Sequence, residues 1–198
     1  AEIGVNHECS IKVAKKLILL AKRGGADAAK FQTYKAEKIV KKNSKAYWDI
    51  KKEKTKSQFE LFSKLDKFQP EDYKNLALYC KKLKIDFLST PFDLDSVSFL
   101  NPLVSLFKIS SSDITNIPLI KKIANCRKPI ILSTGASNLE EIKSAIKILK
   151  KGTKKIIIMH CILNYPTEDW NANLSMISDL KKNFPQYIIG YSDHTLPN

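Results

Sequence analysis

The sequence predicts an α/β fold of the (β/α)8 TIM-barrel type, with about seven of the eight strands present. Short apolar runs of strand length alternate with helical patterns along all 198 residues. Polar residues cluster directly after each of the strand-like runs, as expected of a barrel whose chemistry lies at the carboxyl ends of its strands. An open flavodoxin-like sheet would gather such residues at one switch point. A Gly-x-Gly-x-x-Gly turn does not follow the first run, so a Rossmann fold is not indicated.

The seven strand-like runs are short and rich in apolar side chains. Parallel strands in a barrel are buried on both faces, which explains runs that are apolar nearly throughout. We predict strands over residues 1–5, 28–33, 86–90, 106–110, 130–133, 156–160 and 188–191.

The helical patterns between these runs carry recognisable start and stop signals. Gly24 and Gly25 end the first helix. Pro70 begins the second helix, and two acidic residues follow it in the first turn. Asn138 is an expected N-cap, with Glu141 three residues later as in a capping box. We predict helices over residues 11–22, 70–83, 94–100, 118–124, 139–149 and 174–183.

The length of the chain sets the expected domain organisation. A complete barrel needs about 250 residues and eight strands. This chain begins inside its first strand and stops after the seventh, so we expect one partial (β/α)8 barrel domain over residues 1–198. Residues 34–56 form the one long connection, and loops of that length are often functional.

The net charge of +14 raises the question of a nucleic-acid partner. Only Arg23 and Arg127 are arginines and 32 residues are lysines, whereas proteins that read nucleic acids use arginine heavily. We therefore expect mostly solvated lysine faces, with a polyanion surface or attraction of an anionic substrate as the alternative.

Several features bear on the compartment. No apolar run approaches the roughly 20 residues of a membrane span, and the first residues do not resemble a signal peptide. The four cysteines (Cys9, Cys80, Cys126 and Cys161) have no CxxC spacing. We therefore expect a cytoplasmic protein with reduced thiols and no membrane partner.

Lys30 and Lys108 each lie inside an otherwise apolar strand. A lysine there is costly unless its ammonium group meets an anion. Two such lysines at one barrel mouth predict a dianionic ligand, and lysines that reach solvent at a strand end are the alternative.

Runs of small, mostly hydroxyl residues follow three of the strands, at Ser110–Ser112, Ser133–Gly135 and Ser192. Hydroxyls and loop amides after barrel strands commonly hold phosphate, although each could equally be an ordinary turn or cap. Glu2 lies within the first strand, where burial suits a carboxylate to acid–base work, and Asp113 and Glu8 are further polar candidates.

The histidines have weaker signals. His194 follows Ser192 and Asp193 at the end of the seventh strand, but a metal needs further ligands and none is adjacent in sequence. From the residues alone we expect core or supporting roles for both His194 and His160, and a positioning role for Asp193. Cys161 carries no sign of a lowered pKa, so we do not expect a nucleophile there.

Taken together, these segments resemble the N-acetylneuraminate (sialic acid) synthase family. Examples are Lys-Ile-Ser-Ser-Ser-Asp at 108–113, Asn-Tyr-Pro at 164–166 and Gly-Tyr-Ser-Asp-His-Thr at 190–195. The matching stretches occur in order at every predicted strand: 1–8, 25–33, 87–92, 107–116, 129–135, 160–161, 164–166 and 190–195.

The resemblance implies an enzyme that condenses phosphoenolpyruvate with an open-chain N-acetylhexosamine, such as N-acetylmannosamine. The product is a nine-carbon 2-keto sugar acid, and phosphate leaves by C–O cleavage. A divalent metal, Mn²⁺ or Mg²⁺, polarises the sugar aldehyde as a Lewis acid. It also implies a homodimer in which a partner's C-terminal antifreeze-like domain closes the site.

Carried over to this sequence, the resemblance gives each candidate a role. Glu2, Lys108 and Asp113 are the implied catalytic residues, with Glu2 as the acid–base group. Implied phosphoenolpyruvate ligands are Lys30, Thr90, Lys108, Ser111, Ser133 and Ser192. Gln32, Asp113 and Tyr165 are the implied sugar contacts, and His194 is an implied metal ligand.

Two departures from the family pattern stand out. The family often has glutamate where this chain has Asp113. The family's second metal histidine lies on the eighth strand, beyond Asn198. We therefore expect the 198 residues alone to be inactive or nearly so.

Alternative functions remain open from the sequence. Legionaminate and pseudaminate synthases use the same phosphoenolpyruvate half with other amino sugars, and a related synthase could take a sugar phosphate. A non-catalytic, basic polyanion-binding barrel would show steeply salt-dependent binding to nucleic acid. A non-catalytic relic of the family is the remaining alternative.

Overall fold

The computed structural model describes residues 1–196. The chain divides into two compact units, Ala1–Ser105 and Leu106–Asn198. All hydrogen-bonded strand neighbours are parallel. A three-stranded sheet in the order β1-β2-β3 forms the first unit, and a four-stranded sheet in the order β4-β5-β6-β7 forms the second.

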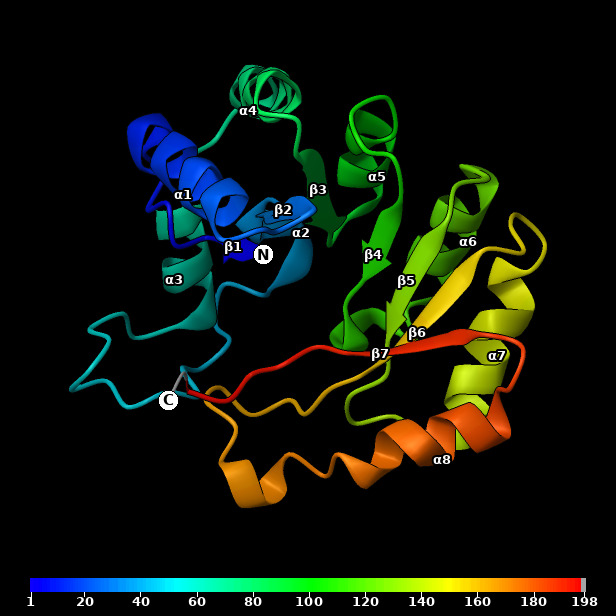
Figure 1. Cartoon of the computed structure of the whole chain (residues 1–198). Helices are drawn as coiled ribbons and strands as arrows, with labels where there is room; N and C mark the ends of the chain where they lie inside the picture. The colour runs from blue at the N-terminus through cyan, green and yellow to red at the C-terminus, as the bar shows by residue number, and fades with distance from the viewer. Residues whose placement is uncertain (197–198) are drawn as a thin grey trace. The chain divides into compact units, whose positions relative to one another are not determined.

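The first unit joins β1 (Glu2–Gly4), β2 (Ala28–Thr33) and β3 (Asp86–Pro91). Its helices α1 (Ile11–Arg23) and α4 (Pro70–Lys82) lie over one face of this sheet (Figure 1). The remaining helices are α2 (Ala36–Ile39), α3 (Gln58–Leu65) and α5 (Leu94–Leu100). Ile18, Phe31, Leu76 and Leu100 are fully buried and form the centre of this core.

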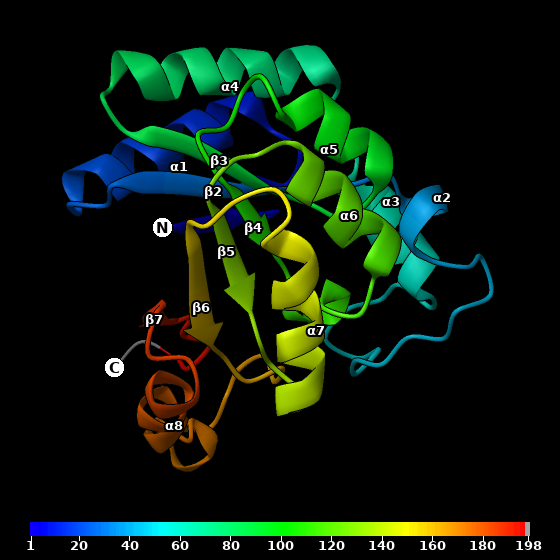
Figure 2. The ribbon, with the colours of Figure 1, turned by 90° about the vertical axis from the view of Figure 1, so that its right-hand side faces the viewer.

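The second unit joins β4 (Phe107–Ile109), β5 (Ile130–Ser133), β6 (Ile156–His160) and β7 (Ile188–Tyr191). Helices α6 (Ile117–Asn125) and α7 (Leu139–Leu149) lie beside each other on one face of the sheet, and α8 (Ser175–Asn183) packs on β6 and β7 (Figure 2). Two short 3₁₀ turns, η1 (Ser111–Asp113) and η2 (Asp169–Asn171), follow β4 and β6.

The seven predicted strands and six predicted helices are confirmed, each within one residue at either end. The local signals act as expected: the Asn138 side chain accepts from the Glu141 amide and the Glu141 carboxylate accepts from the Asn138 amide. The α/β architecture with parallel sheets is therefore confirmed. Among the described residues the strands form two sheets and do not close a barrel.

The long connection after β2 contains helix that the sequence analysis did not anticipate. Helix α2 lies inside residues 34–56, and α3 begins just after them. Ser57 starts α3 because its hydroxyl accepts from the Glu60 amide at 3.1 Å. Lysines crowd this part of the chain and obscure the apolar period.

In the part of the chain that is described, none of the helices is long and apolar enough to cross a membrane.

Candidate functional site

The pleat of β2 determines which side chains of the first unit can form a site. Ala29, Phe31 and Thr33 are buried, whereas Lys30 and Gln32 are only partly covered. Successive side chains of a strand point to opposite faces, so Lys30 and Gln32 share the less covered face.

Glu2, Lys30 and Thr90 come together on that face, from three adjacent strands. The Lys30 ammonium forms an ion pair with the Glu2 carboxylate, and it lies 3.5 Å from the Thr90 hydroxyl. The Lys30 side chain is 15% exposed and that of Glu2 is 50% exposed. Lys30 therefore has an anionic partner within the chain, and Glu2 keeps access to solvent.

Gln32 is positioned beside the same group. Its backbone carbonyl accepts a hydrogen bond from the Tyr73 hydroxyl at 3.1 Å. A Cβ added at Gly4, where φ is +54°, would lie 3.1 Å from a Glu2 carboxylate oxygen and 3.9 Å from the Gln32 amide nitrogen. Gly4 thus supplies both a left-handed turn and the space between these two side chains.

In the second unit, Lys108 repeats the arrangement of Lys30. It is the partly exposed residue between buried Phe107 and Ile109 on β4. Its ammonium donates to the hydroxyl of Ser133, at the end of β5, at 2.8 Å. Ser133 is only 2% exposed, so this lysine and hydroxyl form a partly buried polar pair at the carboxyl ends of two neighbouring strands.

Ser111 lies in a tightly packed group with Gly135 and Cys161. The Cys161 thiol is 3.7 Å from the Ser111 hydroxyl. A Cβ at Gly135 would lie 2.9 Å from the Cys161 sulfur and 3.2 Å from the Ser111 oxygen. Only glycine fits there without displacing one of them, so Gly135 and Cys161 determine where the Ser111 hydroxyl sits.

Asp113 ends the turn after β4 and is partly buried. Asn116 donates to its carboxylate at 3.0 Å, and the Ser112 hydroxyl donates at 3.5 Å. Burial raises the pKa of Asp113, and these two hydrogen bonds oppose that shift. Ser112 belongs to the hydroxyl run selected from the sequence, whereas Asn116 was not selected.

His194, Ser192 and Tyr165 meet after β7. The Nδ1 atom of His194 lies 2.6 Å from the Ile162 carbonyl, so this nitrogen carries the proton. The Nε2 atom therefore has a lone pair, and the Ser192 hydroxyl lies 3.4 Å from it. The exposed Tyr165 ring is tilted against the imidazole, with 4.1 Å between ring centroids.

Asp193 holds this loop together through hydrogen bonds to its neighbours. Its carboxylate accepts from the amide and hydroxyl of Thr195 and from the Tyr191 hydroxyl. The hydrogen bonds from Thr195 lower its pKa. The Thr167 amide donates to the His194 carbonyl at 2.8 Å, which fixes the backbone beside the imidazole.

The other histidines lie in the core. His160 is 4% exposed, and its Nε2 atom lies 2.8 Å from the Ala172 carbonyl. His7 is stacked on Phe68, and its Nδ1 accepts from the Cys9 amide at 3.0 Å. Burial lowers the pKa of His7. Glu8 is exposed.

The fit to a divalent metal rests on His194 alone. Its Nδ1 is held by a backbone carbonyl while its Nε2, 3.4 Å from the Ser192 hydroxyl, faces away from that carbonyl, which is an arrangement found in metal-ligating histidines. Within residues 1–196, three His, Cys, Asp or Glu side chains do not gather in a geometry that could hold a metal ion. The described residues therefore supply one suitable ligand and not a complete site.

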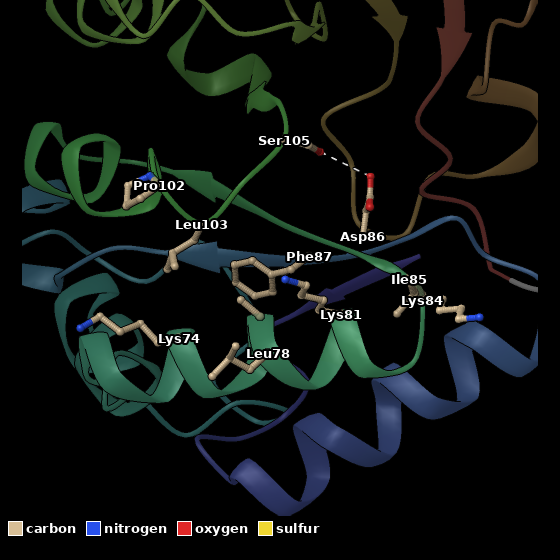
Figure 3. Close-up of a pocket in the computed structure, with 11 residues that line it drawn as sticks. Lys74, Leu78, Lys81, Lys84, Ile85, Asp86, Phe87, Pro102, Leu103 and Ser105 are labelled. Carbon is tan, nitrogen blue, oxygen red and sulfur yellow. Dashed lines mark hydrogen bonds between the residues drawn. The ribbon is translucent and has the colours of Figure 1, made fainter.

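A hollow of about 570 Å³ in the first unit lies at the opposite end of β3 from Thr90. Asp86 and Phe87, the first residues of β3, line it together with Leu78 and Leu103. Figure 3 shows the hydrogen bond from Ser105 to Asp86 at its edge. The predicted site residues do not line this hollow, so the hollow and the predicted site lie at opposite ends of β3.

Sequence reasoning placed Gly135 only in the polar run after the fifth strand and did not single out Gly4 or Asn116. Gly4 and Gly135 act through the space they leave, which depends on neighbours distant in the chain. Asn116 had a detectable signal, because an asparagine just before Ile117-Pro118 is a typical N-cap, and α6 begins there.

Comparisons with known proteins agree on one family. The chain is 45% identical to N,N'-diacetyllegionaminic acid synthase of Campylobacter jejuni, over 98% of this chain and 60% of that protein. It is 37% identical to N-acetylneuraminate-9-phosphate synthase of Mus musculus, over 98% of this chain and 54% of that protein. The chain thus spans little more than half the length of these relatives.

A solved structure shares the fold. The N-acetylneuraminic acid (sialic acid) synthetase of Leptospira borgpetersenii, crystallised with citrate, superposes with a TM-score of 0.86 at 34% identity. The match covers 98% of this chain and 64% of that one. The family model described as NeuB family matches residues 17–198, which is most of the sequence, and the chain therefore belongs to the NeuB family.

Proposed function

We propose that this chain forms the catalytic part of a phosphoenolpyruvate-dependent synthase. The enzyme would condense phosphoenolpyruvate with an open-chain amino sugar to give a nine-carbon 2-keto sugar acid and phosphate. The observation that carries the proposal is the pair of lysine–hydroxyl contacts at the ends of parallel strands, Lys30 with Thr90 and Lys108 with Ser133. Together with the family, they support a ligand with two anionic groups.

The two lysines would hold the carboxylate and phosphate of phosphoenolpyruvate. Ammonium groups that are partly withdrawn from water interact strongly with anions. The hydroxyls of Thr90, Ser111, Ser133 and Ser192 would donate to the same oxygens. Three of them, Thr90, Ser111 and Ser133, are nearly buried and fixed in place, which favours a preorganised site.

Glu2 would serve the proton transfers, with Lys108 and Asp113 as the other catalytic groups. Carbon 3 of phosphoenolpyruvate forms a bond with the aldehyde carbon, and water adds at carbon 2. The new bond uses the C2=C3 π electrons, and the aldehyde oxygen becomes an alkoxide. The Glu2 carboxylate would take one proton from the water and pass it to that alkoxide. The C–O bond to phosphate would then break as the carbon 2 carbonyl forms, and the second water proton would leave with the phosphate. The half exposure of Glu2 supports access of water to its carboxylate.

Gln32, Asp113 and Tyr165 would bind the amino sugar. Gln32 and Asp113 offer amide and carboxylate groups to hydroxyls, and the exposed Tyr165 ring offers an apolar face. His194 would hold a divalent metal, Mn²⁺ or Mg²⁺, with ligands from outside the described residues. When bound, such a metal supplies Lewis-acid polarisation of an aldehyde.

We further propose that residues 1–198 form seven strands of a (β/α)8 barrel domain, in a cytoplasmic homodimer. The seven parallel strands in sequence order and the α/β fold support this architecture. Activity of the whole protein would need the remaining metal ligands, so we expect little turnover from these 198 residues alone.

The identity of the amino sugar has two candidates. N-acetylmannosamine would give N-acetylneuraminate. An amino sugar with two N-acetyl groups would give N,N'-diacetyllegionaminate, and the 45% identity to a synthase of that name favours this second candidate.

The test is phosphate release from phosphoenolpyruvate by the full gene product that carries this sequence, with Mn²⁺. We expect release only when an amino sugar is present, faster with one of the two candidates. Release without sugar dependence, or no release with any amino sugar, would refute the proposal. Steeply salt-dependent binding of RNA by the same inactive protein would then support the polyanion alternative.

A further inference from the structure

We propose that Asn116 is a positioning residue that holds the Asp113 carboxylate in its sugar-binding orientation. The inference rests on the proposed function in one respect, namely that Asp113 contacts the amino sugar. It adds a residue that fixes the direction of the Asp113 carboxylate and favours its ionised form.

Both ends of the Asn116 amide are used. Its Nδ2 atom donates to Oδ1 of Asp113 at 3.0 Å, and its Oδ1 atom accepts from the Leu119 backbone amide at 3.4 Å. The second contact caps α6 and fixes which atom of the amide faces Asp113. Asn116 therefore connects the carboxylate directly to the start of a helix.

That helix is anchored in the core. Leu119, Ile120 and Ile123 of α6 are essentially fully buried. Backbone hydrogen bonds close the same turn, because the Asn116 amide donates to the Asp113 carbonyl at 2.9 Å and the Ile120 amide donates to the Asn116 carbonyl at 3.0 Å. The orientation of the Asp113 carboxylate is thus fixed by packing that lies outside the ligand site.

The other donor to Asp113 is a weaker restraint. The Ser112 hydroxyl lies 3.5 Å from the carboxylate, at the limit of a hydrogen bond, and Ser112 is exposed. The same hydroxyl lies 3.0 Å from that of Ser110. Asn116 is consequently the well-placed donor that favours the ionised carboxylate against the effect of burial.

Two substitutions separate this role from helix capping. Aspartate and serine are both good N-caps, so Asn116→Asp and Asn116→Ser should keep α6. Asn116→Asp replaces the donor with a second carboxylate, and Asn116→Ser shortens the side chain so that its hydroxyl serves the cap. The matched controls are Asn138→Asp and Asn138→Ser, at the N-cap of α7, where the side chain accepts from the Glu141 amide at 2.9 Å.

In the full gene product, we expect Asn116→Asp to raise the KM for the amino sugar about tenfold, with KM for phosphoenolpyruvate within about twofold. The acidic limb of kcat/KM should move up by about one pH unit, because neighbouring carboxylates share a proton. Asn116→Ser should raise the same KM by a smaller factor, and both Asn138 variants should match the unmodified protein.

A second measurement does not depend on activity. The Asp113 carboxyl signal, assigned by its loss in Asp113→Asn, is titrated by ¹³C NMR in the unmodified protein and in Asn116→Ser. A higher pKa in the variant supports the proposal, and an unchanged pKa overturns it, even if no sugar is turned over. An active enzyme whose Asn116 variants behave like the Asn138 variants also overturns it, while the proposed function stands.

Discussion

Lys30 on β2 and Glu2 on β1 are ion-paired across neighbouring parallel strands, and Thr90 on β3 lies 3.5 Å from the same ammonium group. The lysine that the sequence singles out for an external anion thus already has an internal one. A bound phosphoenolpyruvate would either contact the Lys30 ammonium beside the Glu2 carboxylate or displace that carboxylate from it. Either event would alter the environment of the carboxylate proposed for proton transfer.

Replacing Glu2 should therefore affect the chemical step more than folding. We expect Glu2→Gln to lower kcat by about 10²- to 10⁴-fold, the usual contribution of a general acid–base group. Asp95→Asn is the control, because it removes the partner of another lysine of the same unit, Lys38, in an exposed ion pair. The measurement is steady-state phosphate release, and equal activity of the two variants would contradict the role of Glu2.

Gly135 should be intolerant of even one added methyl group. Gly135→Ala would place a Cβ 2.9 Å from the Cys161 sulfur and 3.2 Å from the Ser111 oxygen. We expect a loss of about 1–3 kcal/mol in unfolding free energy, typical of overpacking. We also expect a raised KM for phosphoenolpyruvate, because the Ser111 hydroxyl must shift.

Gly24→Ala is the control for that substitution. An added Cβ at Gly24 comes no closer than 3.4 Å to its nearest neighbour, the Leu20 carbonyl. Its effect on both quantities should be small. A Gly135→Ala protein with normal unfolding free energy and normal KM for phosphoenolpyruvate would contradict the close packing of Gly135 against Cys161 and Ser111.

The sequence predicted the helices and strands well, and the spatial neighbours of individual side chains poorly. Lys30 and Lys108 could be found because a charge inside an apolar strand breaks a local pattern. Asn116 could be assigned as an N-cap but not as a partner of the Asp113 carboxylate, and the packing role of Gly135 depends on Cys161 after another strand. Helix α3 was missed because Ser57, its cap, stands among lysines that hide the apolar period.

His7 predicts a pH dependence of stability in the first unit. Its pKa is lowered by burial, so the unfolded chain takes up the proton more readily than the folded one. Stability from neutral His7 is complete above the ordinary value of about 6.5 and is lost as the pH falls through the lowered folded pKa.

The corresponding variant is His7→Asn, whose oxygen can replace Nδ1 as acceptor for the Cys9 amide. At pH 8 its unfolding temperature should be lower, because the stacking on Phe68 is lost. Between pH 8 and pH 5, however, it should fall by less than in the unmodified protein. Parallel pH curves for the two proteins would show that His7 does not titrate on unfolding.

His194 gives the prediction for metal removal. Its Nδ1 proton is directed at the Ile162 carbonyl, which leaves Nε2 as the only ring nitrogen able to bind a cation. In the full gene product, His194→Ala should raise the Mn²⁺ concentration for half-maximal activity at least about tenfold, and chelation should abolish activity of the unmodified enzyme.

A binding measurement that needs no turnover, in which free Mn²⁺ is followed by electron paramagnetic resonance, should show the same weakening. The metal-free unfolding temperature should change little, since the imidazole is only partly buried. Unchanged Mn²⁺ binding in His194→Ala would remove His194 from the metal site and leave its contact with Tyr165 as its main role.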